Sequence, residues 1–279
     1  NYDFIHGVDN NQSQAFTVDL TSGSIRVIDE AFIKSRVSPT TTSGLIVLLL
    51  SLIISFLIAI IRGLYFVPIT NPAEFSDLDI EVPILGVLPF LDEKNEDSLS
   101  QTLESLVVNI RYLSESTNKI VAITSASPIN GKSFVSRNLA IQLSKLGFKT
   151  MLIDCDYKRG DLHKEFNKDT IERKENFTED NFEEFRINDD LYFLPRIKKL
   201  RNSFQFIDSD HFTNFINRCR KDFDYIVIDT APFLSVSDTS VLLTYSDVNL
   251  LVTRHELTKI SEVRQCLDNI QQLGLEFDG

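Results

Sequence analysis

Residues 126–133 read A-S-P-I-N-G-K-S, a glycine-containing loop that ends in a lysine and a serine. An apolar run at 119–125 predicts a strand directly before the loop, and 133–146 predicts a helix directly after it, which is the context that a phosphate-binding loop requires. In such a loop, backbone N–H groups and the helix N-terminus cradle a polyphosphate, Lys132 can reach the β and γ phosphates, and the Ser133 hydroxyl can ligate Mg²⁺. We therefore predict that the chain binds ATP and Mg²⁺, and that ATP contacts Ser127, Pro128, Ile129, Asn130, Gly131, Lys132, Ser133 and Phe134.

Three aspartates stand at the ends of predicted strands. Asp154 and Asp156 close the segment KTMLIDCD, and Asp229 closes DYIVID. Residues two apart in an extended segment point to the same side, so the first two carboxylates can face one crevice, at the strand ends where an open parallel sheet binds its ligands. Any one of the three alone could be a helix cap or a turn residue. Together with the loop they predict the catalytic residues Lys132, Asp154, Asp156 and Asp229, and the Mg²⁺ ligands Ser133, Asp154, Asp156 and Asp229.

The elements that must position these residues alternate between strand and helix. After a helical spacing of apolar residues at 98–113, the pattern predicts strands at 119–125, 149–154, 224–229 and 248–254 and helices at 133–146 and 261–273. Such alternation predicts an α/β fold that is doubly wound around a mostly parallel sheet with both faces covered.

A long apolar segment precedes this region. Residues 44–61 (GLIVLLLSLIISFLIAII) carry no charge, and a helix of that length spans about 27 Å, close to the ~30 Å hydrocarbon core of a membrane. A buried core helix is the alternative, but such a helix usually has a polar side and this one has none. We divide the chain into the end of a larger region, a transmembrane helix, a proline-containing linker and a P-loop domain, at 1–43, 44–66, 67–97 and 98–279.

The composition of the chain indicates which kinds of partner it is unsuited to bind. A formal net charge of −12 argues against nucleic acid, because nucleic-acid binders usually present a basic face. The spacing of Cys155, Cys219 and Cys266 matches no metal site and indicates free thiols. The first residue is not methionine and the last residues, LGLEFDG, stop where a strand begins, so we expect a fragment at both ends.

As an ordered set, the apolar helix, the proline-containing linker, ITSASPINGKS, LIDCDYKRGDLH and DYIVIDTAPFLSVSD resemble the bacterial tyrosine autokinases that are fused to polysaccharide co-polymerases, P-loop ATPases of the MinD/ParA-like class. The resemblance covers about 27–279, and it implies that 1–43 is the C-terminal end of a periplasmic chain-length-determinant region and that 98–279 is a kinase domain. It implies that Lys132 and Ser133 bind phosphates and metal, that Asp154 and Asp156 bind metal and activate a tyrosine hydroxyl, and that Asp229 is the Walker B carboxylate. The implied partners are a second copy of the chain, the machinery that polymerises and exports a surface polysaccharide, and a tyrosine phosphatase. The implied location is the bacterial inner membrane, with the kinase domain in the cytoplasm.

The sequence also departs from that family. Gln101, Glu104 and Val107 stand where the family usually carries a Glu-x-x-Arg-x-x-Arg docking pattern, and the tyrosine-rich tail that receives phosphate would lie beyond Gly279. Two other readings stay open: an ATPase switch of the MinD/ParA-like class, and a nucleotide-binding assembly scaffold without kinase activity. The switch class carries an additional loop lysine where this chain has Ser127, and the intact loop and aspartates speak against a degenerate site.

Overall fold

The computed structural model describes residues 4–9, 12–18, 25–26, 41–65, 68–72, 75, 82–89, 96–113, 118–172, 182–198, 200 and 202–279. The chain divides into two compact units, at 1–62 and at 63–279.

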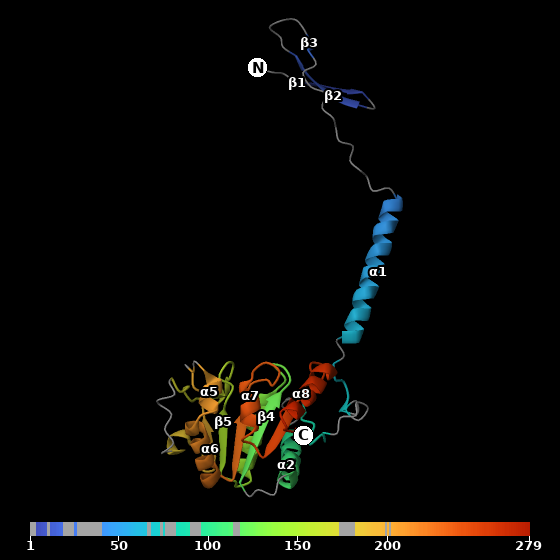
Figure 1. Cartoon of the computed structure of the whole chain (residues 1–279). Helices are drawn as coiled ribbons and strands as arrows, with labels where there is room; N and C mark the ends of the chain where they lie inside the picture. Colours follow the sequence, from blue (N-terminus) through green and yellow to red (C-terminus); the bar gives the residue numbers. More distant parts are fainter. Residues whose placement is uncertain are drawn as a thin grey trace. The chain divides into compact units, whose positions relative to one another are not determined.

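The first unit contains a small antiparallel sheet and most of a long helix (Figure 1). The sheet has the order β1-β2-β3, formed by β1 (Phe4–Asp9), β2 (Gln12–Val18) and β3 (Ile25–Arg26). Strand β3 lies in the strand-like alternation SIRVID at 24–29, whereas the mixed polar sequences of β1 and β2 lack a sustained alternation.

Helix α1 (Thr41–Tyr65) contains the predicted apolar segment. Residues 43–63 form one helix that is long and apolar enough to cross a membrane, and none of that span is buried against protein. A row of leucine and isoleucine side chains exposed in this way is unfavourable in water and favourable in hydrocarbon. The length and composition of α1 therefore match the predicted anchor.

A fully parallel sheet of five strands forms the centre of the second unit, in the order β6-β5-β7-β4-β8. Its strands are β4 (Lys119–Ser125), β5 (Thr150–Asp154), β6 (Leu191–Leu194), β7 (Tyr225–Asp229) and β8 (Val248–Val252). Because every strand of the sheet runs in the same direction, the ends of β4, β5 and β7 meet at one edge. The predicted α/β fold is confirmed.

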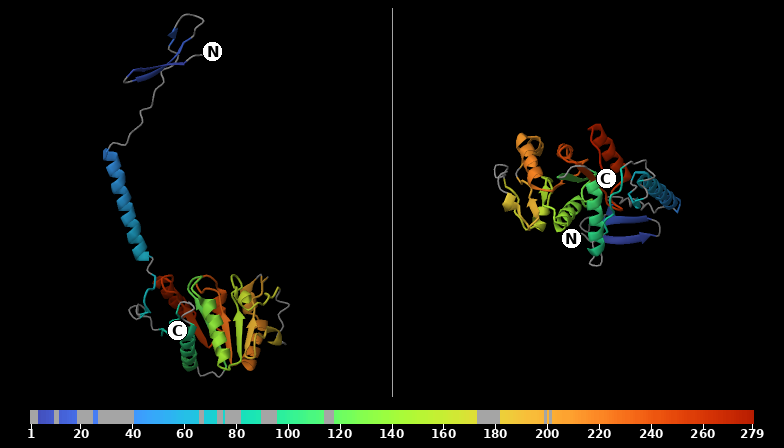
Figure 2. Two further views of the ribbon diagram at one scale, coloured as in Figure 1. Left: turned by 180° about the vertical axis from the view of Figure 1, so that it is seen from behind. Right: turned by 90° about the horizontal axis from the view of Figure 1, so that it is seen from below.

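Helices cover both faces of this sheet (Figure 2). Side chains of α2 (Glu96–Leu113) and α3 (Lys132–Lys145) pack with Val121 and Ile123 on one face. The neighbouring Ile120 and Ala122 point to the other face, where the covering helices are α5 (Ser203–Ile207), α6 (Asp210–Asp222), α7 (Asp238–Leu243) and α8 (Ile260–Gln272). Alternate strand residues thus enter two separate cores, which holds the carboxyl edge of the sheet in a fixed position.

Part of the predicted linker, which belongs to the second unit, packs against the rest of that unit. Ile69 is 5% exposed, its N–H donates to the Thr258 carbonyl at 2.9 Å, and its own carbonyl accepts from the Glu256 N–H at 2.8 Å. Partly buried Leu85 and Leu88 also join the core under α2 and α3. The proline content of this segment predicts an extended chain, and these apolar residues explain why described parts of it are held against the domain.

Candidate active site

The phosphate loop connects β4 to α3, as predicted. Helix α3 begins at Lys132, one residue before the predicted start, and Gly131 precedes it with a φ of 91°. Ile129, at the tip of the loop, has a φ of 71° and is 76% exposed, although a β-branched residue rarely adopts this conformation. The Arg254 guanidinium donates to the Ile129 carbonyl at 3.1 Å and helps to hold the tip.

Asp154 and Asp229 are neighbours across two adjacent strands. They are the last residues of β5 and β7, and the strand register pairs them directly. Asp156 follows two residues later and donates its backbone N–H to Asp154 Oδ1 at 3.1 Å. All three side chains are buried, with residue exposures of 2% or less. The structure therefore brings the three predicted carboxylates to one place.

The end of the phosphate loop supplies the opposite charge. Lys132 Nζ donates to Asp156 Oδ2 at 2.9 Å and lies 4.0 Å from Asp229 Oδ2. The Ser133 hydroxyl donates to Asp229 Oδ2 at 2.7 Å. The loop and the strand ends are thus linked by direct contacts among Lys132, Ser133, Asp156 and Asp229, four of the five predicted catalytic or metal-binding residues, and Asp154 lies beside them.

Backbone groups fix the orientation of Asp156. Its Oδ1 accepts the N–H of Arg159 at 2.9 Å and the N–H of Lys158 at 3.3 Å, while both basic side chains are exposed. Gly160 completes this turn, and its N–H donates to the Asp156 carbonyl at 2.8 Å. A Cβ atom at Gly160 would overlap the Asp154 carboxylate and lie 2.7 Å from the Asp156 carbonyl. Only glycine leaves room for the carboxylate here, a requirement that the sequence analysis did not identify.

Electrostatics at the site favour a cation. Burial, and then the Asp229 charge, raise the pKa of the Asp154 carboxyl well above its ordinary value. Burial likewise raises the pKa of Asp229, although the Lys132 ammonium opposes the shift. Burial alone would lower the pKa of Lys132, but the carboxylates of Asp229 and Asp156 outweigh burial and raise it. One ammonium does not fully compensate three buried carboxylates.

These residues suit Mg²⁺. Carboxylate and hydroxyl oxygens are the hard ligands that this ion prefers, and it usually takes only one or two carboxylates together with water and phosphate oxygens. Asp154 Oδ2 is buried and has no hydrogen-bond partner, which leaves an acceptor for a ligand. Within the described ranges, no group of three or more His, Cys, Asp or Glu side chains forms a metal site by itself. Any Mg²⁺ here would therefore rely on Ser133 and on phosphate oxygens as well as on the aspartates.

Ser136 is a further residue that the sequence analysis missed. Its hydroxyl donates to Asp229 Oδ1 at 3.0 Å and contacts the Lys132 carbonyl at 2.9 Å, and the residue is fully buried. The two Asp229 oxygens are therefore held by serines one turn apart on α3. The spacing of Ser133 and Ser136 is visible in the sequence, but helical spacing alone does not show which strand end faces them.

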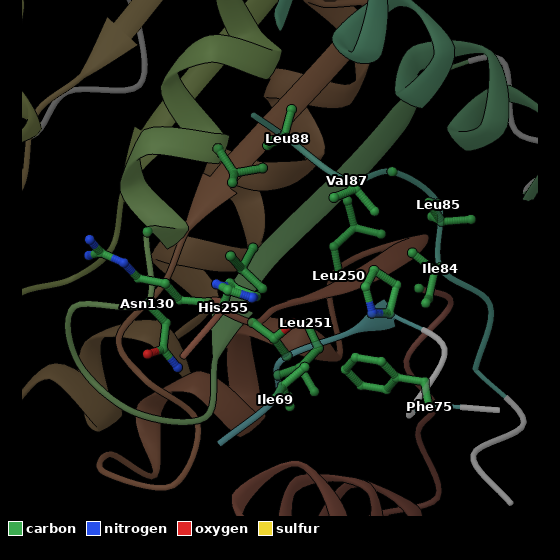
Figure 3. Close-up of a pocket in the computed structure, with 18 of the residues that line it drawn as sticks. Ile69, Phe75, Ile84, Leu85, Val87, Leu88, Asn130, Leu250, Leu251 and His255 are labelled. Atoms are coloured by element: carbon green, nitrogen blue, oxygen red, sulfur yellow. The ribbon is translucent and has the colours of Figure 1, made fainter. Parts of the chain in front are cut away.

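A cavity of about 930 Å³ lies beside the phosphate loop (Figure 3). Its walls come from the loop at 130–131, from the linker at 82–89 and from the end of β8 with the turn that follows, 250–256. Asn130 and His255 are the polar side chains among those labelled in Figure 3, and neither polar atom of the buried Asn130 amide has a hydrogen-bond partner. None of the four predicted catalytic residues lines this cavity, but Asn130, Gly131 and Phe134, which are predicted to contact ATP, do.

Comparison with known proteins agrees with this geometry. The chain is 27% identical over 288 residues to the tyrosine-protein kinase ptk of Acinetobacter johnsonii, in an alignment that covers 92% of this chain and 39% of that protein. It thus spans about two fifths of the length of that relative. The VpsO kinase domain superposes with a TM-score of 0.56 and 26% identity, over 67% of this chain and 97% of that domain. The BceF tyrosine kinase domain, at 21% identity, gives a TM-score of 0.64 over 76% and 97% of the two chains and shows the shared fold.

The family assignment rests on a match to a family model. Residues 118–278, more than half of the chain, match the family model described as AAA domain. This range begins just before β4 and includes the phosphate loop and all three aspartates. The chain therefore belongs to the AAA domain family, and it is similar to bacterial tyrosine-protein kinases.

Proposed function

We propose that this chain is part of a membrane-anchored protein-tyrosine autokinase that transfers the γ-phosphoryl group of ATP. The observation that carries the proposal is the contact of Lys132 and Ser133 with Asp156 and Asp229 at the carboxyl edge of the sheet. Phosphoryl transfer requires positioning and charge neutralisation more than covalent chemistry, and these residues supply both. The similarity to tyrosine-protein kinases selects tyrosine as the acceptor class.

Each residue has a distinct role in this proposal. Lys132 would exchange its contact with Asp156 for the β and γ phosphates of ATP, which the loop and the N-terminus of α3 would bind. Ser133, Asp154, Asp156 and Asp229 would hold Mg²⁺, directly or through its water molecules, and the ion would supply positive charge that neutralises phosphate oxygens. Asp156, released from Lys132 but still held by two backbone N–H groups, orients the incoming hydroxyl together with Asp154. The Asp154 oxygen that has no hydrogen-bond partner is the acceptor for the tyrosine proton.

The wider role follows from the family resemblance. We propose that α1 anchors the chain in the bacterial inner membrane with the P-loop unit in the cytoplasm, where ATP is available. Phosphorylation would then control the assembly of the machinery that polymerises and exports a surface polysaccharide, and a tyrosine phosphatase would reverse it. The length and apolar surface of α1 support the anchor.

A phosphotyrosine measurement on the full-length protein tests the activity. We expect phosphotyrosine on the wild type in the presence of ATP and Mg²⁺ and none on Asp154→Asn, because the amide cannot accept the proton. Lys145→Met, an exposed change in the last turn of α3, is the matched control and should keep the signal. Bound ATP without phosphotyrosine on the wild type would contradict the kinase and favour a nucleotide switch or a scaffold.

A further inference from the structure

Tyr112 differs from the other described tyrosines in its exposure. It is the penultimate residue of α2, and its side chain is 87% exposed. Val108, one helical turn earlier, is 49% exposed, so the two side chains form a small apolar projection on one side of the helix. An aromatic side chain exposed to this extent has no packing role within its own domain.

The remaining tyrosines whose side chains the structure describes are buried or half-buried, and each makes contacts within the fold. Tyr192 and Tyr245 donate their hydroxyls to Glu183 and to the Ile207 carbonyl, at 3.2 Å and 3.0 Å. Tyr225 is 4% exposed, and its ring packs edge-on against a phenylalanine. The Tyr157 hydroxyl contacts a buried cysteine sulfur at 3.7 Å. These four side chains are therefore less accessible to a kinase active site than Tyr112, which is 87% exposed.

Tyr112 lies too far from the active site of its own copy to be phosphorylated there. Lys119, the first residue of β4, donates its ammonium to the Arg111 carbonyl at 2.7 Å, which fixes the end of α2 at the amino edge of the sheet. Lys132 and Asp229 lie at the carboxyl edge. The seven residues of β4 separate the two edges by roughly 20 Å at ~3.3 Å per residue. A phosphoryl group can therefore reach Tyr112 only from the active site of a second copy.

We propose that Tyr112 is an acceptor tyrosine that one copy of the chain phosphorylates on another. This inference rests on the proposed kinase activity. The phenolic oxygen of Tyr112 attacks the γ-phosphorus, the bond between that phosphorus and the β,γ-bridging oxygen breaks, and ADP leaves. The phenolic proton passes to the Asp154 carboxylate of the phosphorylating copy. The products are ADP and one phosphotyrosine, and no other reactant is needed.

Mixing two variants of the full-length chain tests the proposal. Asp154→Asn serves as the inactive acceptor that keeps Tyr112, and Tyr112→Phe serves as the active donor. Trypsin cleaves after Arg111 and Lys119 and releases a peptide that contains Tyr112 as its only tyrosine. Because the donor lacks Tyr112, any phosphotyrosine in this peptide comes from transfer between copies. The double variant Asp154→Asn/Tyr112→Phe is the control acceptor, and a synthetic glutamate–tyrosine copolymer reports the donor's activity.

We expect the phosphorylated peptide in the mixture and its loss when the control acceptor is used, with copolymer phosphorylation unchanged. Copolymer phosphorylation without the modified peptide would overturn the assignment of Tyr112 and leave the kinase intact. A modified peptide in the wild type but not in the mixture would overturn transfer between copies. If neither the copolymer nor the chain is phosphorylated, the kinase proposal fails, and the inference fails with it. Since Tyr112 is exposed, Tyr112→Phe should melt at the wild-type temperature.

Discussion

Replacing Lys132 by methionine should destabilise the nucleotide-free protein as well as weaken ATP binding. The ammonium lies 2.9 Å from Asp156 Oδ2 and 4.0 Å from Asp229 Oδ2, and the lysine side chain is only 11% exposed. Methionine keeps the apolar length of the side chain but removes the charge. Three buried carboxylates then remain without their cation.

The loss of stability in Lys132→Met can be worked out from the burial of its ion pair. Two unit charges 4 Å apart attract by about 4 kcal/mol at an effective dielectric constant of ~20. Removing one partner of a buried pair typically costs about 3 to 5 kcal/mol, because the other charge stays buried and unpaired. In a domain of this size 1 kcal/mol corresponds to roughly 2 to 4 °C in the melting temperature. We therefore expect Lys132→Met to melt roughly 6 to 20 °C below the wild type at neutral pH.

The loss of stability in Lys132→Met should depend on pH. Burial already raises the pKa values of Asp154 and Asp229 in the folded state, and removal of the Lys132 ammonium raises them further. Between the ordinary pKa of aspartate and these raised values, the folded variant binds more protons than the unfolded chain. Its stability therefore falls as the pH rises through the raised pKa values and recovers at acid pH. Thermal melts of the detergent-solubilised chain in EDTA, across a series of pH values, measure this dependence.

Two further variants make the measurement specific. Lys145→Met removes an exposed lysine from the same helix and should change the free energy of unfolding by less than about 1 kcal/mol. Lys132→Met/Asp156→Asn should recover part of the loss, because one uncompensated carboxylate is removed with the ammonium. Equal melting temperatures for the wild type and Lys132→Met at neutral pH would refute the reasoning, as would a difference that does not change with pH.

The same contacts predict the effects of three other substitutions. Asp154→Asn should abolish phosphotyrosine and raise the melting temperature at neutral pH. This gain in melting temperature should disappear at acid pH, where the wild-type carboxyl is protonated, and thermal melts at the two pH values measure it. Gly160→Ala should lower the transfer rate by roughly 10- to 100-fold, because its Cβ would displace the Asp154 carboxylate, and single-turnover kinetics would detect this. Ser136→Ala should cost about 1 to 3 kcal/mol in urea unfolding, since Asp229 Oδ1 loses a buried donor; an unchanged midpoint would show that the bond is unimportant.

The sequence predicts the main elements of the P-loop unit because its strands are short, apolar and buried on both faces. Strand β4 was predicted at 119–125 with the observed bounds, and β5 and β7 differ from the predicted 149–154 and 224–229 by one residue at their starts. In a parallel sheet, such predictions also place the strand-end aspartates at one edge. The convergence of the loop with Asp154, Asp156 and Asp229 could thus be anticipated from spacing alone.

Other features depend on tertiary contacts that no local pattern records. Strand β6 (Leu191–Leu194) has only four residues and follows a strongly charged segment, so its apolar run was too short to distinguish from a turn. The pairing of Lys132 with Asp156, the space at Gly160 and the exposure of Tyr112 all depend on which surfaces meet after folding. Residue type indicates what these groups can do, and the packing decides what each of them contacts.

The contacts of Lys132 connect nucleotide binding to the arrangement of the acceptor site. Its ammonium is bonded to Asp156, the same carboxylate that two backbone N–H groups hold toward the centre of the site. A polyphosphate would compete for that ammonium and leave Asp156 oriented by the backbone but without its cation. The buried carboxylates would then be compensated by the cation that accompanies ATP, because a buried charge is tolerated only when it is paired. In the proposed mechanism, the site would therefore reach its reactive arrangement only with the complete metal–nucleotide complex, which would disfavour deprotonation of a tyrosine before the phosphoryl donor is in place.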